Sequence, residues 1–400
     1  MHDTEVVIVG SGIIGLTIAR ELLKRGCEKI LILEKESQLG VHASGRNSGI
    51  LHAGVYYTPD SLKAKSCLRG NMLMSEFCTK NHLPYLKTGK VIVVKSESEL
   101  ETLAELERRA RANGASVEMI DEKTLKELEP SARTVKKALW VKNTATVDPR
   151  KVLEALAKEF ESSGKVTIRF NCMFKGVKSS FEIITSCGNV RFEHFINCAG
   201  AYCDCVAHAF GLGKEYKIVP FKGLYWKLQR DCVLNDTIKG NIYPVPNLQN
   251  PFLGVHFSRN IYGDVYVGPT AIPAFGREHY GVISGIDREA LQILKANAIL
   301  FFRHPQFRSV AIHEPLKYLK PFFYKDASAL VRGLKPGDLV PSNKVGIRPQ
   351  LINKNTLSLE MDFVMIKDGN TVHVLNPISP AFTASMDLAE KVCNTLESSE

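Results

Sequence analysis

The sequence predicts an α/β protein, and three segments carry that prediction. Residues 5–9 (EVVIV) are a β-branched apolar run, typical of a buried parallel strand. A glycine-rich turn and a helical pattern to about Arg25 follow, and a second apolar run, residues 29–33 (KILIL), ends at Glu34. A later apolar run within residues 190–204 ends in small residues and is expected to return to the same sheet. This order of strand, turn, helix and strand predicts a Rossmann-like domain.

Length and composition indicate a globular protein whose chain is longer than one typical domain. The 400 residues favour two domains, or one large domain with an insertion. Apolar residues make up 44% and charged residues 24%, which suits a soluble protein with a large core. No apolar run approaches the roughly 20 residues that span a bilayer. The first residues, MHDTEVVIVG, lack a basic region before an apolar segment, so we expect no secretion signal.

The cysteines predict a reducing compartment. Ten are scattered along the chain, and only Cys203 and Cys205 lie close together. No second pair or nearby histidine couple completes a tetrahedral metal site. We therefore expect free thiols, no metal and a cytoplasmic protein.

The formal charge of +10 favours anionic partners, such as acidic substrates, phosphates or a membrane surface. Lysine and arginine are dispersed, with only short clusters such as RRAR at 108–111, and no nucleic-acid motif accompanies them. We expect no nucleic-acid partner. Peripheral contact with the inner face of an anionic membrane stays open on charge alone.

The turn after the first strand carries the most specific motif, G-x-G-x-x-G, formed by Gly10, Gly12 and Gly15 with Ser11 between the first two. Gly10 allows the tight turn, Gly12 lets the backbone approach a pyrophosphate, and Gly15 lets the helix pack closely on the sheet. Glu34 lies where an acidic residue would accept hydrogen bonds from a ribose. In this full context the motif predicts a bound dinucleotide.

The rest of the chain favours FAD over NAD. An NAD enzyme usually continues at once with further βαβ units, but here a polar, glycine-rich loop (GRNSGILHAG, 45–54) follows the second strand. The late strand ending at Ala199 and Gly200 would contact the dinucleotide again. A cofactor held by segments so far apart suggests a flavin buried along its length.

Five stretches are similar to one family and cover essentially the whole chain in the expected order: residues 45–71, 243–257, 267–278, 345–351 and 373–385. The chain resembles the FAD-dependent oxidoreductases of the D-amino-acid oxidase and glycerol-3-phosphate dehydrogenase superfamily, and within it the L-2-hydroxyglutarate dehydrogenases or oxidases. It departs from that group in KGLYW (222–226), where Leu224 replaces an acid, and at the proline after Arg348. Leu224 could alter a contact on the substrate side.

The resemblance implies an interleaved architecture. Residues 1–75, 145–215 and 335–400 would form the FAD-binding domain, and residues 76–144 and 216–334 a substrate domain built on an antiparallel sheet. Sequence patterns agree in part, because residues 88–96 and 264–270 are typical of strands and residues 98–114 of an amphipathic helix. Asp148 and Pro149 suit the start of a helix over 147–160.

The resemblance also implies which residues hold FAD, which we expect to be bound non-covalently. Ser44, Arg46, Asn47 and Ser48 would wrap its pyrophosphate, ribityl chain or ring. The remaining predicted contacts, beyond the glycine turn with Ser11, are Glu34, Lys35, Ala199, Gly200, Gly346, Arg348, Ser379, Pro380 and Ala381.

On the substrate side, His52 would lie near the isoalloxazine ring. A histidine suits a general base because its usual pKa is near working pH; contact with the flavin alone is the alternative. Arg277, Lys222 and Arg348 are candidates to bind substrate carboxylates, since guanidinium forms a bidentate fork with carboxylate. Tyr243 and His256 would line the pocket.

The implied reaction is oxidation of a 2-hydroxy acid, L-2-hydroxyglutarate to 2-oxoglutarate, by hydride transfer to flavin N5, with electrons passing to oxygen or a quinone. An amine, an amino acid or glycerol-3-phosphate remains an alternative substrate on the same fold. A non-catalytic assembly factor is the third hypothesis, and retention of His52, Tyr243, His256 and Arg277 argues against it.

Overall fold

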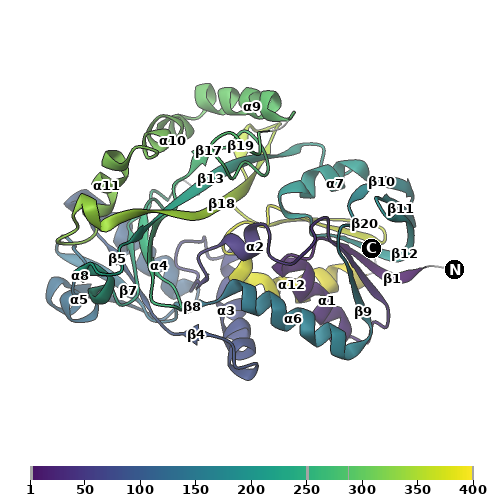
Figure 1. The fold of residues 1–400 in the computed structure, drawn as a ribbon, viewed down its shortest axis with the longest axis horizontal. Coiled ribbons are helices and arrows are strands. Elements are labelled where there is room, and N and C mark those ends of the chain that lie inside the picture. The colour runs from purple at the N-terminus through teal and green to yellow at the C-terminus, as the bar shows by residue number, and fades with distance from the viewer. Residues whose placement is uncertain (1–2, 249–251, 287, 399–400) are drawn as a thin grey trace.

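Two large β-sheets organise the computed structural model, which describes residues 3–248, 252–286 and 288–398 (Figure 1). One sheet is mostly parallel and the other mostly antiparallel. The predicted fold class is therefore confirmed. Residues 249–251, inside one stretch that carried the resemblance, lie outside the described residues.

The first sheet has a parallel centre with antiparallel additions at one side. Its parallel strands, in spatial order, are β9 (Val166–Arg169), β2 (Ile30–Leu33), β1 (Thr4–Val9), β12 (Gly188–Asn197) and β21 (Thr371–Leu375). The antiparallel strands are β20 (Val364–Asp368), β10 (Phe174–Ser179) and β11 (Glu182–Thr185). As predicted, the late strand β12 pairs directly with β1.

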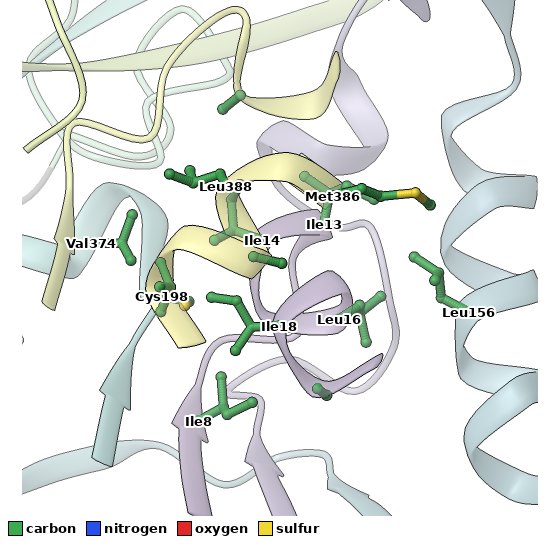
Figure 2. Close-up of a cluster of buried hydrophobic side chains, with 14 of the residues drawn as sticks. Ile8, Ile13, Ile14, Leu16, Ile18, Leu156, Cys198, Val374, Met386 and Leu388 are labelled. Atoms are coloured by element: carbon green, nitrogen blue, oxygen red, sulfur yellow. The ribbon is translucent and has the colours of Figure 1, made fainter. Parts of the chain in front are cut away.

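Helices cover one face of this sheet and form the largest core with it. They are α1 (Ile13–Lys24), α3 (Leu62–Lys80), α6 (Pro149–Ser163) and α12 (Ala381–Glu397). Figure 2 shows Ile14 and Ile18 of α1 beside Cys198 and Val374, while Leu16 points toward α6. Truncating such fully buried side chains typically costs about 2–5 kcal/mol each. On the opposite face, the hairpin β10–β11 and α7 (Cys203–Ala209) enclose a second cluster.

The predicted start of α6 is confirmed in detail. Asp148 accepts hydrogen bonds from the backbone N–H groups of Arg150 and Lys151, at 2.8 and 3.3 Å. Pro149 occupies the first helical position, where its missing N–H costs nothing. Local sequence thus sets where this helix begins.

The second sheet is antiparallel except for one pair, β14 with β5. Its strands in spatial order are β19 (Ser358–Leu359), β18 (Leu339–Asn353), β13 (Tyr216–Leu228), β16 (Val265–Gly268), β15 (His256–Arg259), β14 (Asn241–Pro244), β5 (Lys90–Val93), β7 (Lys137–Val141) and β6 (Val117–Asp121), with β17 (Ile272–Pro273) beside β13. Strand β18 belongs here although it lies in a segment predicted for the FAD-binding domain. The predicted domain boundaries themselves stay a prediction.

The remaining elements complete the molecule around these sheets. A small third sheet holds β3 (Ile50–Leu51), β8 (Ala145–Val147) and β4 (Tyr85–Leu86). The other helices are α2 (Ala43–Arg46), α4 (Leu100–Ala112), α5 (Glu122–Leu128), α8 (Val233–Thr237), α9 (Ala290–Arg303), α10 (Pro305–Leu316) and α11 (Lys320–Ser328), with short 3₁₀ turns at Glu97–Glu99, Gly200–Tyr202 and Pro336–Asp338. The amphipathic helix predicted over 98–114 is α4.

Candidate active site

A cavity of about 880 Å³ lies between the two large sheets and is lined by residues of both. Its volume is within the range of ligand pockets. The predicted residues that line it are Gly10, Ser11, Gly12, Glu34, Lys35, Ser44, Arg46, Asn47, Ser48, His52, Ala199, Gly200, Tyr243, His256, Arg277, Gly346, Arg348, Ser379, Pro380 and Ala381. Gly15 and Lys222 are not among the lining residues. The fold therefore brings together segments that are hundreds of residues apart.

The glycine turn forms one end of the cavity, and its backbone leaves no room for side chains. Gly10 has a φ of +106°, and a Cβ there would lie 2.4 Å from the carbonyl oxygen of Cys198. A Cβ on Gly15 would lie 2.0 Å from the carbonyl oxygen of Gly10. Helix α1 therefore packs directly on the turn and points its N-terminus, with its unpaired N–H groups, at the cavity.

Glu34 is fixed at the end of β2 by hydrogen bonds from the turn. Its Oε2 accepts from the backbone N–H of Ser11 at 3.0 Å and from the Ser11 hydroxyl at 2.6 Å. Its Oε1 accepts from the backbone N–H of Glu36 at 3.0 Å. A carboxylate has about four lone-pair sites, so capacity remains for a ribose hydroxyl. That role of Glu34 stays a prediction.

Lys35 ties the two walls of the cavity together. Its Nζ donates to Glu278 Oε1 at 2.6 Å and to Glu36, and lies 2.9 Å from His42 Nε2. The hydrogen bond from Lys35 lowers the pKa of Glu36. Glu36, His42 and Glu278 are close enough to share a metal ion, but the ammonium group contacts all three and repels a cation.

The residues predicted to wrap the flavin also hold their own loop in shape. Ser44 Oγ accepts from the backbone N–H of Ile13 at 2.9 Å, which satisfies one of the first-turn N–H groups of α1. Arg46 Nε donates to the Val41 carbonyl at 2.6 Å, and Asn47 Nδ2 donates to the Ser44 carbonyl at 2.7 Å. The loop is therefore preorganised along the cavity wall.

His52 lies at the other end of the cavity with its backbone held on both sides. Its N–H donates to Thr383 Oγ1 at 3.1 Å, and its carbonyl accepts from Asn71 Nδ2 at 3.0 Å. Its ring nitrogen Nδ1 is buried and has no hydrogen-bond partner among the described residues. Burial, reinforced by the charge of Lys90, lowers the pKa of His52 to about 3. The imidazole is therefore neutral at physiological pH.

His256 and Tyr243 form a stacked pair in the cavity wall, with ring centroids 3.8 Å apart and planes 23° apart. His256 Nδ1 donates to the Gly254 carbonyl at 2.8 Å, so Nε2 carries the free lone pair of the neutral ring. Burial lowers the pKa of His256 to about 4. The site thus holds two neutral imidazoles.

Lys90 is a charged residue behind this wall that sequence reasoning missed. It is buried, and its Nζ has no hydrogen-bond partner within the part of the chain that the structure describes. The Nζ lies 4.5 Å from the ring centroid of Tyr56 and 5.0 Å from that of Tyr243. Burial lowers the pKa of Lys90 to about 7. Its only sequence signal was a lysine opening an apolar strand, TGKVIVV.

Arg348 is half-buried in the cavity wall, and none of the described residues provides a counter-ion for its guanidinium. Among the described residues it makes no salt bridge, and its Nε has no hydrogen-bond partner. The group lies 5.3 Å from the ring centroid of Phe252. Burial lowers the pKa of Arg348 to about 10 despite the nearby Tyr57 hydroxyl. A half-buried cation without an ion-pair partner among the described residues is suited to an anionic ligand.

Arg277, by contrast, is committed to other protein groups. Its Nη1 and Nη2 donate to the two carboxylate oxygens of Asp204 at 2.5 and 3.0 Å. Its Nε donates to Glu289 at 2.6 Å, and Nη1 also donates to the Ala201 carbonyl. With a second Glu289 contact at 3.4 Å, all five guanidinium N–H groups have acceptors. The geometry therefore does not support Arg277 as a carboxylate ligand.

Lys222 points away from the cavity because side chains alternate along β13. Phe221, Gly223 and Tyr225 line the cavity, whereas Lys222 and Leu224 do not. Lys222 Nζ donates to the Gly281 carbonyl at 2.7 Å instead. Its expected contact with substrate is therefore not supported, and the same holds for Leu224.

The end of β12 lies beside the glycine turn, and the start of α12 contributes another part of the cavity wall. Ala199 and Gly200 follow β12, and Ser379 and Pro380 precede the first helical residue, Ala381. A second helix N-terminus therefore faces the cavity, and its first-turn N–H groups favour oxygen acceptors.

These features fit a flavin dinucleotide along the cavity. The glycine turn and α1 N-terminus would hold the pyrophosphate, and the loop from Ser44 to Ser48 would follow the chain toward the ring. At the far end lie neutral imidazoles and a free cation, where a small anionic substrate could meet the ring. This combination defines a dinucleotide-dependent oxidoreductase.

Comparison with known families agrees. The family model "FAD dependent oxidoreductase" matches residues 5–353, and the chain belongs to that family. It is accordingly an FAD-dependent enzyme.

Among curated proteins, the chain is 37% identical over 412 residues to the mitochondrial L-2-hydroxyglutarate dehydrogenase of Caenorhabditis elegans, covering 97% of this chain and 92% of the relative. It is 34% identical over 402 residues to L-2-hydroxyglutarate dehydrogenase of Escherichia coli K12, covering 99% and 93%. The recognised resemblance is thus confirmed.

Solved structures show the same fold. L-α-glycerophosphate oxidase from Mycoplasma pneumoniae, determined with FAD bound, matches with a TM-score of 0.78 at 23% identity, covering 99% of this chain and 95% of that one. Glycine oxidase from Geobacillus kaustophilus matches with a TM-score of 0.72 at 17% identity, covering 100% and 96%. At these identities the likeness concerns the fold alone.

Proposed function

We propose that this protein oxidises L-2-hydroxyglutarate to 2-oxoglutarate with non-covalently bound FAD. The curated relatives named above support the substrate. The single structural observation that carries the proposal is Arg348, a half-buried cation in the cavity wall whose Nε is buried and which has no counter-ion among the described residues. A dicarboxylate would supply the missing negative charge.

Three residues at the end of the cavity away from the glycine turn bind the substrate and accept its proton. Arg348 binds a substrate carboxylate and fixes its orientation. His52 accepts the hydroxyl proton. Its Nδ1 is buried without a hydrogen-bond partner among the described residues, so Nε2 is the atom available for that transfer. His256, whose tautomer is set by the Gly254 carbonyl, offers Nε2 as an acceptor to a substrate hydroxyl. FAD, when bound, supplies the acceptor for the hydrogen that leaves the substrate's α-carbon with its electron pair.

Substrate charge explains why a histidine with so low a pKa can act as a base. The low pKa of His52 arises from burial and from the charge of Lys90 in the free protein. Two carboxylates entering the cavity favour the protonated ring and so raise its pKa. Proton uptake is then favourable only when the anionic substrate is in place.

Electrons leave the enzyme to oxygen or to a quinone, and the protein works in the cytoplasm with peripheral contact to an anionic membrane. The net charge of +10 supports that contact. Within the described residues, no helix is long and apolar enough to cross a membrane.

Product analysis tests the proposal directly. Purified holoenzyme with an artificial electron acceptor should convert L-2-hydroxyglutarate to 2-oxoglutarate and leave the D isomer unchanged. Turnover of glycerol-3-phosphate or an amino acid in place of the hydroxy acid would contradict the proposed substrate while keeping the flavoenzyme.

A further inference from the structure

Helices α9, α10 and α11 form an arc along one outer edge of the molecule, far from α1 and α6 (Figure 1). Large apolar side chains on this arc and on the loop before it face solvent. Val282, Ile283, Leu291 and Phe302 are between 75% and 79% exposed. Monomeric soluble proteins rarely expose a contiguous group of this kind without a partner.

Helix α9 is apolar on both of its faces. Ile293 and Leu300 are buried toward the rest of the protein, about two turns apart. Leu291, Leu294 and Phe302 project outward with helical spacing and are exposed. A helix on the surface of a soluble protein normally carries polar residues on its outer side. Core packing therefore explains only half of the apolar sequence of α9.

The apolar side chains continue along the next two helices. Ile312 and Leu316 of α10 are exposed four residues apart, and Leu319 and Phe322 extend the series toward α11. We call the exposed side chains of residues 282–286 and 288–325 the basic apolar surface.

Charge on this surface has one sign. Its exposed charged side chains, within the described residues, are all basic: Arg288, Lys295, Arg303, Arg308 and Lys325. Glu289 forms an ion pair with the buried Arg277. Glu314 forms an ion pair with Lys317, and its carboxylate also accepts a hydrogen bond from the backbone N–H of Ala271. The exposed Asp326, just beyond the surface, pairs with Lys317 at 2.9 Å. Glu289, Glu314 and Asp326 thus face Arg277 or Lys317, and the charged side chains that the basic apolar surface exposes among the described residues are basic.

We propose that the basic apolar surface docks the protein on an anionic lipid bilayer, with the apolar side chains inserted at the headgroup level and the basic side chains on the phosphates. Exposed apolar side chains with interleaved lysine and arginine are the pattern of helices that lie in the membrane interface. Helix α9 has 14 residues, roughly 21 Å, so it would lie on a bilayer and not cross it. This inference rests on the proposed peripheral contact and gives it a location.

Docking would bring one wall of the active-site cavity close to the lipid. Glu314 of α10 lines the cavity, and its carboxylate accepts from the N–H of Ala271, which lines it too. Helix α10 is therefore part of both the basic apolar surface and the cavity wall. A lipid-soluble quinone would reach the enzyme by this side.

Vesicle sedimentation of the FAD-loaded full chain tests the inference. We expect binding to vesicles of equal parts phosphatidylglycerol and phosphatidylcholine, weak binding to pure phosphatidylcholine, and loss of binding as salt rises from about 0.05 to 0.5 M. The variant Leu291→Ser/Phe302→Ser should lower the partition coefficient at least about tenfold. The variant Lys295→Gln/Arg303→Gln should lower it for the anionic vesicles only.

Matched variants on other faces are the control. Met72→Ser/Phe181→Ser removes two exposed apolar side chains, and Lys123→Gln/Lys126→Gln removes two exposed charges, from elsewhere on the molecule. Both should bind vesicles like the wild type. Flavin absorbance and turnover with a soluble dye should be unchanged in all four variants, which separates this test from that of the substrate.

Two results would overturn the inference. Wild-type holoenzyme that turns over with the dye but fails to bind anionic vesicles would contradict membrane docking and leave the proposed oxidation reaction unaffected. A dimer that dissociates on Leu291→Ser/Phe302→Ser and never binds vesicles would show that a second copy covers the surface instead.

Discussion

Arg277 and Asp204 form a two-point ion pair, with both partners only 2% exposed at the side chain. Removing one partner of such a pair leaves a buried charge. We expect Arg277→Met to lower the free energy of unfolding by about 3–5 kcal/mol, measured by urea denaturation of the holoenzyme. The double variant Arg277→Met/Asp204→Leu should recover much of that loss. Unchanged stability together with a raised KM would indicate that Arg277 binds the substrate.

Arg348 should behave in the opposite way. Lysine keeps the charge but loses the bidentate fork, so Arg348→Lys should raise the KM for L-2-hydroxyglutarate about 10- to 100-fold. Unfolding free energy and flavin content should change little. Arg332→Lys serves as the control, because that arginine is exposed and does not line the cavity. If Arg348→Lys loses flavin while KM is preserved, Arg348 binds the cofactor and not the substrate.

His52 and His256 should differ in what they contribute to turnover. Loss of a general base typically costs 10²–10⁴-fold, so we expect His52→Gln to lower kcat by about that factor. His256→Gln should lower kcat less and raise KM, because it removes a hydrogen-bonding group. Steady-state kinetics with a dye acceptor gives both numbers. An equal or larger loss of kcat in His256→Gln would make His256 the base.

The pKa of Lys90 predicts a pH-dependent stability. The unfolded chain keeps the lysine proton up to its usual pKa of 10.5, whereas the folded protein releases it near 7. Unfolding therefore takes up a proton between those values, and stability rises with pH across that window and is lowest below it. Lys90→Met should be more stable than wild type at about pH 6, and the difference should shrink by about 1.4 kcal/mol per pH unit above 7.

Urea unfolding at about pH 6, 7, 8 and 9 measures that difference, and the exposed Lys137→Met is the control that should show no trend. A constant difference between Lys90→Met and wild type would mean that Lys90 stays protonated in the fold.

Local pattern predicted the FAD-binding elements well because each has its own short-range cause. The β-branched run of β1, the glycine turn and the Asp148–Pro149 start of α6 are fixed by residues next to one another in sequence. Helices α9 to α11 were not predicted, since an apolar outer face hides the helical alternation of polar and apolar residues.

The side chains of the substrate pocket could be predicted only as a set of candidates. Lys222 sits one residue from the cavity-lining Gly223, and strand register alone decides which of them points inward. Arg277 was an arginine of unknown partner until the fold placed Asp204 against it, 73 residues away. Lys90 looked like an ordinary strand residue because nothing local shows that the sheet buries it between two tyrosines.

The most direct test of the central claim is the anaerobic absorbance of the oxidised flavin after mixing with one candidate substrate at a time. The account predicts rapid bleaching by L-2-hydroxyglutarate, with no bleaching by its D isomer, glycerol-3-phosphate or amino acids, and slow bleaching by the L isomer in His52→Gln. Flavin that stays oxidised with L-2-hydroxyglutarate, in protein that carries a full complement of FAD, would contradict it.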